Sequence, residues 1–464
     1  MKLERLVAAL GPVDVLERAP VDVRDLAYDA RAATPGALFF CVPGARADGH
    51  DFAPEAVERG AVALVVERPL DLPVPQVVVG SAREAMAVAA DEFFGRPTEE
   101  LEVVGVTGTS GKTTTSFLLY AILAAAGRRP GLLGTVEARV GGERRGVVRT
   151  TPEAIDLQRT FREMLDAGDR SCAMEASSHA SELHRLDRVR FAVLVFTNLS
   201  QDHLDFHGDM ESYFEAKRRL FVEGSPPAVV NVGDEYGRRL AAELPGAVTF
   251  SLTGDAAIGP GELAGVELKL RGSFNVENAL GALAAARLLG IDDEAIARGL
   301  ESVRGVPGRF ESVDEGQPFA VVVDYAHKPD ALEKVLRAAR EVAGAGRVIC
   351  VLGAGGDRDR GKRPVMGRLA SGLADVAIVT SDNPRSEDPQ AIIDEIVAGA
   401  VGEVEVVPDR AAAIARAVEL ARQGDVVLIA GKGAEQGQQF ADRTIPFDDR
   451  EAAREALRAL GAAT

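Results

Sequence analysis

A lysine and a threonine, Lys112 and Thr113, end the glycine-punctuated segment Gly108-Thr-Ser-Gly-Lys-Thr113. An apolar, β-branched run at 103–106 precedes this segment, and apolar residues recur at helical spacing after it as far as Gly127. The segment is therefore predicted to connect a buried strand to a helix N-terminus, where free backbone N–H groups and the helix dipole attract an anion. Because the lysine and the hydroxyl can reach terminal phosphates and Mg²⁺, we predict a site for a nucleoside triphosphate.

Carboxylate and imidazole side chains follow two further apolar runs. One group is Met174-Glu-Ala-Ser-Ser-His179, and the other is Thr197-Asn-Leu-Ser-Gln-Asp-His-Leu-Asp205. In open α/β sheets, ligands bind beyond the carboxyl ends of the strands, so both groups are predicted to face the triphosphate. There, Glu175 and His203 could hold Mg²⁺. Spacing alone is a weak signal, since a loop histidine is more often a plain hydrogen-bonding residue than a metal ligand.

The elements that must position these groups predict an α/β fold in three domains. A chain of 464 residues is too long for one ordinary core. We expect a small N-terminal α/β domain at 1–98, a central phosphate-binding domain with a mainly parallel sheet at 99–310, and a Rossmann-like α/β domain at 311–464. Strands are expected at 37–42, 63–66, 76–79, 103–106, 191–197, 228–232, 319–323, 348–352, 376–380 and 426–430, and helices from about 82 and over 278–289.

Composition and charge exclude several classes of protein. The formal net charge is -18, and no large basic run offsets it, which argues against a general binder of nucleic acid or anionic membranes. Cys41, Cys172 and Cys350 lie far apart in apolar contexts and are predicted to be reduced core thiols. Residues 1–20 contain no long apolar stretch, so we expect neither a signal peptide nor membrane insertion, and a cytoplasmic location.

A series of longer motifs runs in order along nearly the whole chain. The motifs are GTSGKTT at 108–114, TTP at 150–152, EASSH at 175–179, TNLSQDHLDFHG at 197–208, GSFNVENAL at 272–280, GVPGRFE at 305–311, VDYAHKPD at 323–330, GAGGDRDRGKRP at 353–364 and DNPR at 382–385. Together they resemble the Mur ligases, the ATP-dependent amide ligases of peptidoglycan synthesis. The phosphate-binding segment has the spacing of that family.

The resemblance implies a monomeric enzyme that uses ATP and Mg²⁺. Its substrates would be UDP-N-acetylmuramoyl-L-Ala-D-Glu, bound by the N-terminal domain, and meso-2,6-diaminopimelate, bound by the C-terminal domain. In the implied reaction the γ-phosphate passes to the side-chain carboxylate of D-Glu, and an amine then attacks the acyl phosphate and releases phosphate. Metal ions and Lys112 would offset the repulsion between the two anions, so no protein nucleophile is needed.

The resemblance also implies the residues of the ATP and metal sites. Lys112, His203 and Lys217 would be catalytic, and Lys217 matches a family lysine that CO₂ converts to N6-carboxylysine. Without the resemblance, Lys217 would be interpreted as a solvated helix lysine beside Arg218 and Arg219. The ATP site would comprise Gly108, Thr109, Ser110, Gly111, Lys112, Thr113, Thr114, Asn278, Arg309 and Asp324, and the metal site Thr113, Glu175, His203 and Lys217.

Two further sets of residues would bind the other substrates. An arginine at the fourth position of Asp-Asn-Pro-Arg accompanies diaminopimelate in the family, because a guanidinium can hold its extra carboxylate bidentately. A glutamate would attract the distal ammonium. The UDP-sugar set is Tyr28, Ala30, Thr150, Thr151, Ser177 and Arg185, and the acceptor set is Arg358, Asp382, Asn383, Pro384, Arg385, Gly431 and Glu435.

Three residues depart from the family pattern, and three alternatives stay open. Ala30 replaces a serine, Leu183 a glutamine and Ala434 a histidine. The nearest alternative is an L-lysine-adding ligase, which would favour an uncharged or acidic surface in place of Arg385. A folylpolyglutamate-type ligase is more distant, since the TTP and DNPR motifs argue against it. A catalytically inactive ATP-binding scaffold is disfavoured because the implied catalytic residues are all present.

Overall fold

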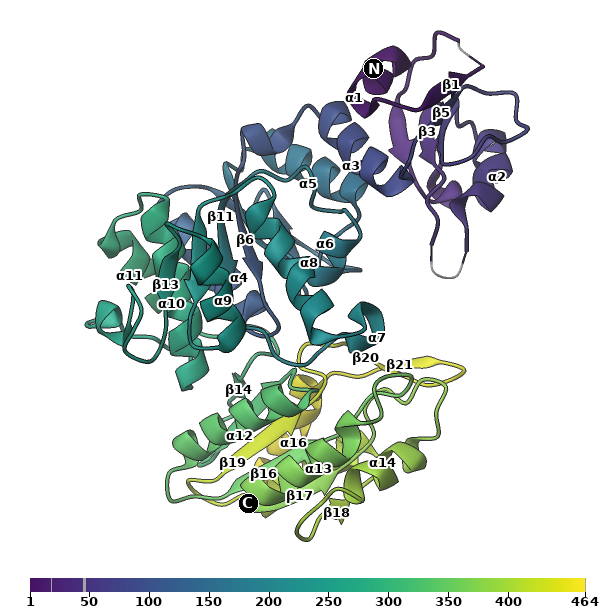
Figure 1. Cartoon of the computed structure of the whole chain (residues 1–464). Helices are drawn as coiled ribbons and strands as arrows, with labels where there is room; N and C mark the ends of the chain where they lie inside the picture. Colours follow the sequence, from purple (N-terminus) through teal and green to yellow (C-terminus); the bar gives the residue numbers. More distant parts are fainter. Residues whose placement is uncertain (18, 45–46, 464) are drawn as a thin grey trace.

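The computed structural model describes residues 1–17, 19–44 and 47–463. Figure 1 shows three successive α/β bodies, with the central body lying between the N-terminal and C-terminal bodies. Each body is built on its own sheet. None of the helices described is both long and apolar enough to cross a membrane.

The N-terminal body contains a five-stranded sheet in the order β1-β5-β4-β3-β2. Strands β3 (Ala37–Phe40) and β4 (Ala63–Val66) are buried along their whole length, as expected for apolar strands covered on both faces. The core of this body includes Ala154 and Ile155 of the central body, so the two bodies share a packed contact. The other elements are α1 (Leu3–Leu10), β1 (Asp14–Leu16), β2 (Asp25–Ala27), α2 (Ala53–Glu58), β5 (Gln76–Val78) and α3 (Ala82–Phe93).

The central body contains an eight-stranded sheet in the order β13-β12-β11-β6-β10-β7-β8-β9. It is parallel from β13 to β7, and β8 and β9 extend it as antiparallel strands. The strands are β6 (Glu102–Thr107), β7 (Pro130–Leu133), β8 (Ala138–Val140), β9 (Glu143–Arg145), β10 (Ser171–Glu175), β11 (Phe191–Phe196), β12 (Ala228–Asn231) and β13 (Val248–Phe250).

Helices cover both faces of the central sheet. Val104 and Val106 of β6 belong to the core beneath α4, α10 and α11, whereas Val103 belongs to the core beneath α5 and α8. This alternation follows from the two-residue period of a strand. The helices are α4 (Lys112–Ala125), α5 (Ala154–Asp166), α6 (Ser178–Glu182), α7 (Leu204–His207), α8 (Met210–Val222), α9 (Glu235–Glu243), α10 (Ser273–Leu288) and α11 (Asp293–Ser302).

The C-terminal body contains a six-stranded sheet in the order β14-β15-β19-β16-β17-β18. Helices α12, α13 and α14 cover one face, and α15 and α16 cover the other. Its elements are β14 (Glu311–Val313), β15 (Ala320–Asp324), α12 (Pro329–Ala343), β16 (Val348–Leu352), α13 (Lys362–Leu373), β17 (Val376–Val379), α14 (Pro389–Val397), β18 (Glu405–Val406), α15 (Arg410–Leu420), β19 (Val426–Ala430), β20 (Gly437–Gln439), β21 (Thr444–Pro446) and α16 (Asp449–Ala463).

The predicted α/β class and the mainly parallel sheets are confirmed. The strands predicted at 63–66, 348–352 and 426–430 have the observed bounds. The helix predicted at 278–289 is observed as α10, which begins earlier, directly after Gly272, whose φ of 91° suits glycine. The three cysteines are free and buried, as predicted.

Candidate active site

A cavity of about 620 Å³ lies where the central and C-terminal bodies meet. The residues after β6, β10 and β15 line it, which places it beyond the carboxyl ends of parallel strands. It brings together most of the residues predicted for the ATP, metal and UDP-sugar sites. Those in its lining are Thr109, Ser110, Gly111, Lys112, Thr113, Thr114, Thr150, Thr151, Glu175, Ser177, Arg185, His203, Lys217, Asn278, Arg309 and Asp324, together with Arg358 of the predicted acceptor site.

The phosphate-binding segment forms the turn between β6 and α4 that the sequence predicts. Gly108 and Gly111 have φ values of 147° and 87°, and a β-carbon at either position would collide with Thr197 or Asn278. Both glycines are therefore required by the turn. Lys112 donates from Nζ to the carbonyl oxygens of Gly108 at 2.8 Å and Thr109 at 2.9 Å. Burial lowers the pKa of Lys112 to about 8.

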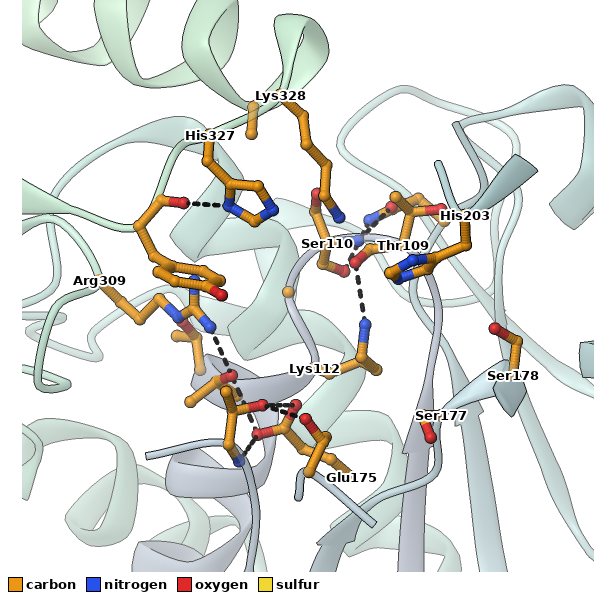
Figure 2. A pocket seen from close by; sticks show the side chains of 18 of the residues that line it. Thr109, Ser110, Lys112, Glu175, Ser177, Ser178, His203, Arg309, His327 and Lys328 are labelled. Carbon is orange, nitrogen blue, oxygen red and sulfur yellow. Dashed lines mark hydrogen bonds between the residues drawn. The ribbon is translucent and has the colours of Figure 1, made fainter. Parts of the chain in front are cut away.

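Glu175 is a buried carboxylate beneath this turn (Figure 2). Its Oε1 accepts from the Thr113 hydroxyl at 3.0 Å and from the Thr135 backbone N–H at 2.7 Å, and its Oε2 accepts from the Thr135 hydroxyl at 3.0 Å. Arg309 donates from Nη2 to the Thr113 hydroxyl at 3.1 Å. A buried carboxylate and a threonine hydroxyl in contact are oxygen donors of the kind that Mg²⁺ prefers.

Lys217 lies on α8 and is 1% exposed, so its interpretation as a solvated helix lysine is wrong. Apolar residues of α8 pack into the core of the central body, and Lys217 lies among them on this helix. Its Nζ donates to the Gly108 carbonyl at 3.0 Å and lies 4.6 Å from the centre of the Tyr213 ring. Burial, with a further contribution from the Lys112 charge, holds the pKa of Lys217 well below its usual value. Lys112 and Lys217 thus share one carbonyl oxygen, which favours a neutral amine at Lys217.

His203 stands on a loop that meets the C-terminal body. Its Nε2 lies 2.8 Å from Oδ2 of Asp202, and Lys328 of the C-terminal body forms an ion pair with the same oxygen. Figure 2 shows Lys328 reaching toward the loops that carry Ser110 and His203. Burial lowers the pKa of His203, which favours its neutral form. Within the described ranges, no three histidine, cysteine, aspartate or glutamate side chains group closely enough to hold a metal ion.

Asn278 of α10, Arg309 between α11 and β14, and Asp324 at the end of β15 line another part of the cavity. Nδ2 of Asn278 donates to Oδ1 of Asn275 at 3.2 Å. Asp324 accepts from the backbone N–H of Phe310 at 2.7 Å, and burial raises its pKa to about 6 although Arg309 opposes the shift. The Arg309 guanidinium lies 4.5 Å from the centre of the Tyr325 ring. These contacts join the end of β15 to the phosphate-binding turn.

Four of the predicted UDP-sugar residues form one group, and two lie apart from it. The Thr151 hydroxyl donates to the Glu175 carbonyl at 2.8 Å and lies 3.1 Å from Oγ of Ser177, while Arg185 donates to the Thr151 carbonyl at 3.1 Å. Thr150 lies 3.1 Å from the Thr135 hydroxyl. In the N-terminal body, Ala30 is buried, and the Tyr28 hydroxyl donates to Asp156 of α5 at 2.6 Å. Neither Tyr28 nor Ala30 is in the lining of the cavity.

Arg358 and Arg385, two of the predicted acceptor residues, line a second cavity of about 400 Å³. Arg358 lines both cavities, so the two adjoin each other. Arg385 lines the second cavity, and its Nη1 donates to the Gly356 carbonyl at 2.6 Å, which fixes the guanidinium. Arg385 has a φ of 51°, held by a backbone hydrogen bond to the Gln439 carbonyl at 3.0 Å. Pro384 sits against Gly356, where any side chain would collide with its carbonyl.

Asp382, Asn383, Gly431 and Glu435 are in the lining of neither cavity, but contacts join them to one another. Asp382 and Asn383 are buried at the end of β17, and a β-carbon on Gly431 would lie 2.5 Å from Oδ2 of Asp382. Nδ2 of Asn383 donates to Oε2 of Glu435 at 2.8 Å. The ends of β17 and β19 therefore meet at this point.

Sequence reasoning missed several residues of the site. Asp202 and Lys328 both stand inside quoted motifs, so their motif positions were a usable signal for the pair that they form. Lys432 stands between two predicted acceptor residues and is fully buried. Thr135 lies in no motif, and no sequence signal indicated its two hydrogen bonds to Glu175.

Comparison with known proteins agrees with this geometry. Residues 22–94 match the Mur ligase family, catalytic domain; residues 106–286 match the Mur ligase middle domain; and residues 308–433 match the Mur ligase, glutamate ligase domain. Together these three matches cover most of the chain.

Individual relatives extend the comparison over almost the whole chain. The UDP-N-acetylmuramoyl-L-alanyl-D-glutamate--2,6-diaminopimelate ligase of Solibacter usitatus is 47% identical, over 96% of this chain and 95% of the relative. The protein of the same name from Geobacillus thermodenitrificans is 46% identical, over 99% of both chains. A solved structure with that ligase name is 32% identical, covers 96% of both chains and has a TM-score of 0.66. The chain therefore belongs to the Mur ligase family.

Proposed function

We propose that this protein is an ATP-dependent ligase that joins meso-2,6-diaminopimelate to the D-Glu side-chain carboxylate of UDP-N-acetylmuramoyl-L-Ala-D-Glu. The observation that carries the proposal is the adjoining pair of cavities, because Arg358 borders both the phosphate-binding turn and the Arg385 pocket. An amine bound in the second cavity would thus face a carboxylate activated in the first. Relatives that carry this activity in their names share 46–47% of their residues with the chain over nearly its full length.

Phosphate transfer to the carboxylate requires that two anions approach each other. The N–H groups at the start of α4 and the Lys112 ammonium supply positive charge where the γ-phosphate would lie. Arg309, from the segment between α11 and β14, and Lys328, from the C-terminal body, bring two further cations to the cavity. The proposed ATP site is completed by Asn278 and Asp324, and the resulting acyl phosphate is then open to attack by the amine.

The proposed Mg²⁺ site comprises Thr113, Glu175, His203 and Lys217. The residues fit the ion, because Glu175 offers a buried carboxylate in contact with the Thr113 hydroxyl and His203 is held neutral by burial. Mg²⁺ bound there would neutralise part of the phosphate charge. The remaining ligands would come from phosphate oxygens and from a carboxylated Lys217.

Carboxylation of Lys217 is a proposal that its burial supports. Only a neutral amine attacks CO₂, forming a carbamate and releasing a proton, and burial holds Lys217 in that neutral form. The product places an anion where the neutral amine stood, and this anion attracts the neighbouring Lys112 ammonium. Catalysis is thus assigned to Lys112, His203 and Lys217.

The two remaining substrates occupy the outer parts of the site in this proposal. The UDP-sugar would contact Thr150, Thr151, Ser177 and Arg185, with Tyr28 and the backbone at Ala30 on the N-terminal body. The acceptor would contact the Asp382-Asn-Pro-Arg385 loop, Arg358, Gly431 and Glu435. The proposed division of labour is 1–98 for the UDP-sugar, 99–310 for ATP and 311–464 for the amino acid, in a cytoplasmic monomer.

One assay tests the function. Purified protein is given ATP, Mg²⁺ and UDP-N-acetylmuramoyl-L-Ala-D-Glu, and phosphate release is compared with meso-diaminopimelate and with L-lysine. Faster release with diaminopimelate is expected, because L-lysine lacks the carboxylate that Arg385 would hold. Equal rates with the two amines, or a faster rate with L-lysine, would contradict the assignment of diaminopimelate as the acceptor. No phosphate release with either amine would contradict the assignment of the protein as a ligase.

A further inference from the structure

Lys432 is a buried cation that joins the two loops of the proposed acceptor site. It follows Gly431 after β19, and its side chain has no exposed surface. Its Nζ donates to Oδ1 of Asn383 at 2.8 Å and to Oε2 of Glu435 at 3.1 Å, and it lies 3.8 Å from Oδ1 of Asp382. A lysine is almost never fully buried unless it is paired, so these contacts account for its position.

Glu435 is the group that this arrangement orients. Its Oε2 accepts from both Lys432 and Asn383, whereas its Oε1 makes no hydrogen bond in the part of the chain that the structure describes. The Glu435 side chain is 38% exposed, so Oε1 is available to a ligand. Burial raises the pKa of Tyr325, a residue of the main cavity, and the negative charge of Glu435 raises it further. Glu435 therefore lies near Tyr325, which lines the main cavity.

We infer that Lys432 is a positioning residue that sets the preference for an acceptor with a distal ammonium, an inference that rests on the proposed function. Lys432 does not touch the acceptor. It fixes Oε2 of Glu435 so that Oε1 meets the ammonium, and its charge compensates the paired carboxylates of Asp382 and Glu435. Without Lys432, Glu435 would rotate toward water and the two carboxylates would repel each other.

The test compares meso-diaminopimelate with L-2-aminopimelate, which keeps the attacking amine and both carboxylates but lacks the distal ammonium. The ratio of kcat/KM for the two acceptors is measured for wild type, Lys432→Met, Lys432→Arg, Glu435→Gln and the Lys432→Met/Glu435→Gln double variant. Lys432→Met is expected to lower the ratio about tenfold, as for the loss of a hydrogen bond to a charged group, with the KM for ATP unchanged. When Lys432→Met is added to Glu435→Gln, the ratio should change by less than about twofold.

Controls separate positioning from a general structural role. Lys269→Met changes an exposed lysine and should leave the ratio unchanged. The inference would be overturned if Lys432→Met lowered kcat/KM equally for both acceptors. It would also be overturned if Lys432→Met lowered the ratio by the same factor in wild type and in Glu435→Gln. If Lys432→Met does not fold, Asn383→Ser removes the other donor to Oε2, and an unchanged ratio there would also overturn it. If wild type uses neither acceptor, the proposed function itself fails.

Discussion

Replacing Arg385 by alanine tests how the acceptor is recognised. Arg385 borders the second cavity, and its Nη1 is held by the Gly356 carbonyl at 2.6 Å, so its other donors are pre-organised to hold a carboxylate. Hydrogen bonds to charged groups contribute about 1.5–3 kcal/mol each. For a bidentate pair beside solvent we expect a loss of about 2–4 kcal/mol, which corresponds to about 30- to 1000-fold in kcat/KM for diaminopimelate.

The assay is phosphate release at varied diaminopimelate, with the KM for ATP measured in parallel. The KM for ATP should be unchanged, because the phosphate-binding turn lies in the other cavity. Arg385→Lys is the matched control: it keeps the charge and the positive φ of a non-glycine residue but lacks the planar fork, so its loss should be intermediate. Unaltered diaminopimelate kinetics in Arg385→Ala would remove Arg385 from the acceptor site.

Three further predictions concern buried charges. Lys217→Met should lower the rate of phosphate release by about 100-fold or more. The intact mass measured in bicarbonate buffer should show one added CO₂ on the wild-type protein and none on the variant. Full activity of wild-type protein without the added CO₂ would contradict a role for the carboxylated lysine. Arg410→Met should lower the free energy of unfolding by about 3–5 kcal/mol, because Arg410 and Asp449 form an ion pair without exposed surface. The control Arg416→Met, in a half-exposed pair with Glu405, should lower it by less than about 1 kcal/mol. Equal denaturation midpoints for the two variants would refute the difference. The pKa of Asp324 is raised to about 6 in the folded chain, so its protonated form adds stability at low pH that is lost as the pH rises through about 6. Asp324→Asn keeps an acceptor for the Phe310 N–H but does not titrate. Between pH 4 and pH 7 the free energy of unfolding of wild type should therefore fall by about 2 kcal/mol more than that of the variant, as measured by chemical denaturation. Parallel pH curves for the two proteins would disprove the assignment.

The elements that sequence predicted well are those in which local pattern and tertiary environment agree. β4, β16 and β19 are short apolar runs that are buried on both faces, so their bounds could be predicted from composition alone. β2 and β9 are strands of three residues at sheet edges, and β9 is polar at every position, so neither has an apolar run that would identify it. The phosphate-binding turn was predictable because its glycines, lysine and threonine each have a role within the turn itself or at the start of α4.

The candidate site was less predictable where side chains from separate bodies meet. The ion pair of Lys328 with Asp202 depends on how the C-terminal body packs against the central one, and the burial of Lys217 depends on which face of α8 turns inward. A charged residue at such a position follows the apolar residues around it. Pattern analysis that assigns every lysine to the surface therefore gives the wrong environment for Lys217.

The most direct test of the account is the acceptor comparison with wild-type protein. With ATP, Mg²⁺ and UDP-N-acetylmuramoyl-L-Ala-D-Glu at saturation, phosphate release should have a higher kcat/KM with meso-diaminopimelate than with L-lysine. A kcat/KM that is equal for the two amines, or higher for L-lysine, would contradict it.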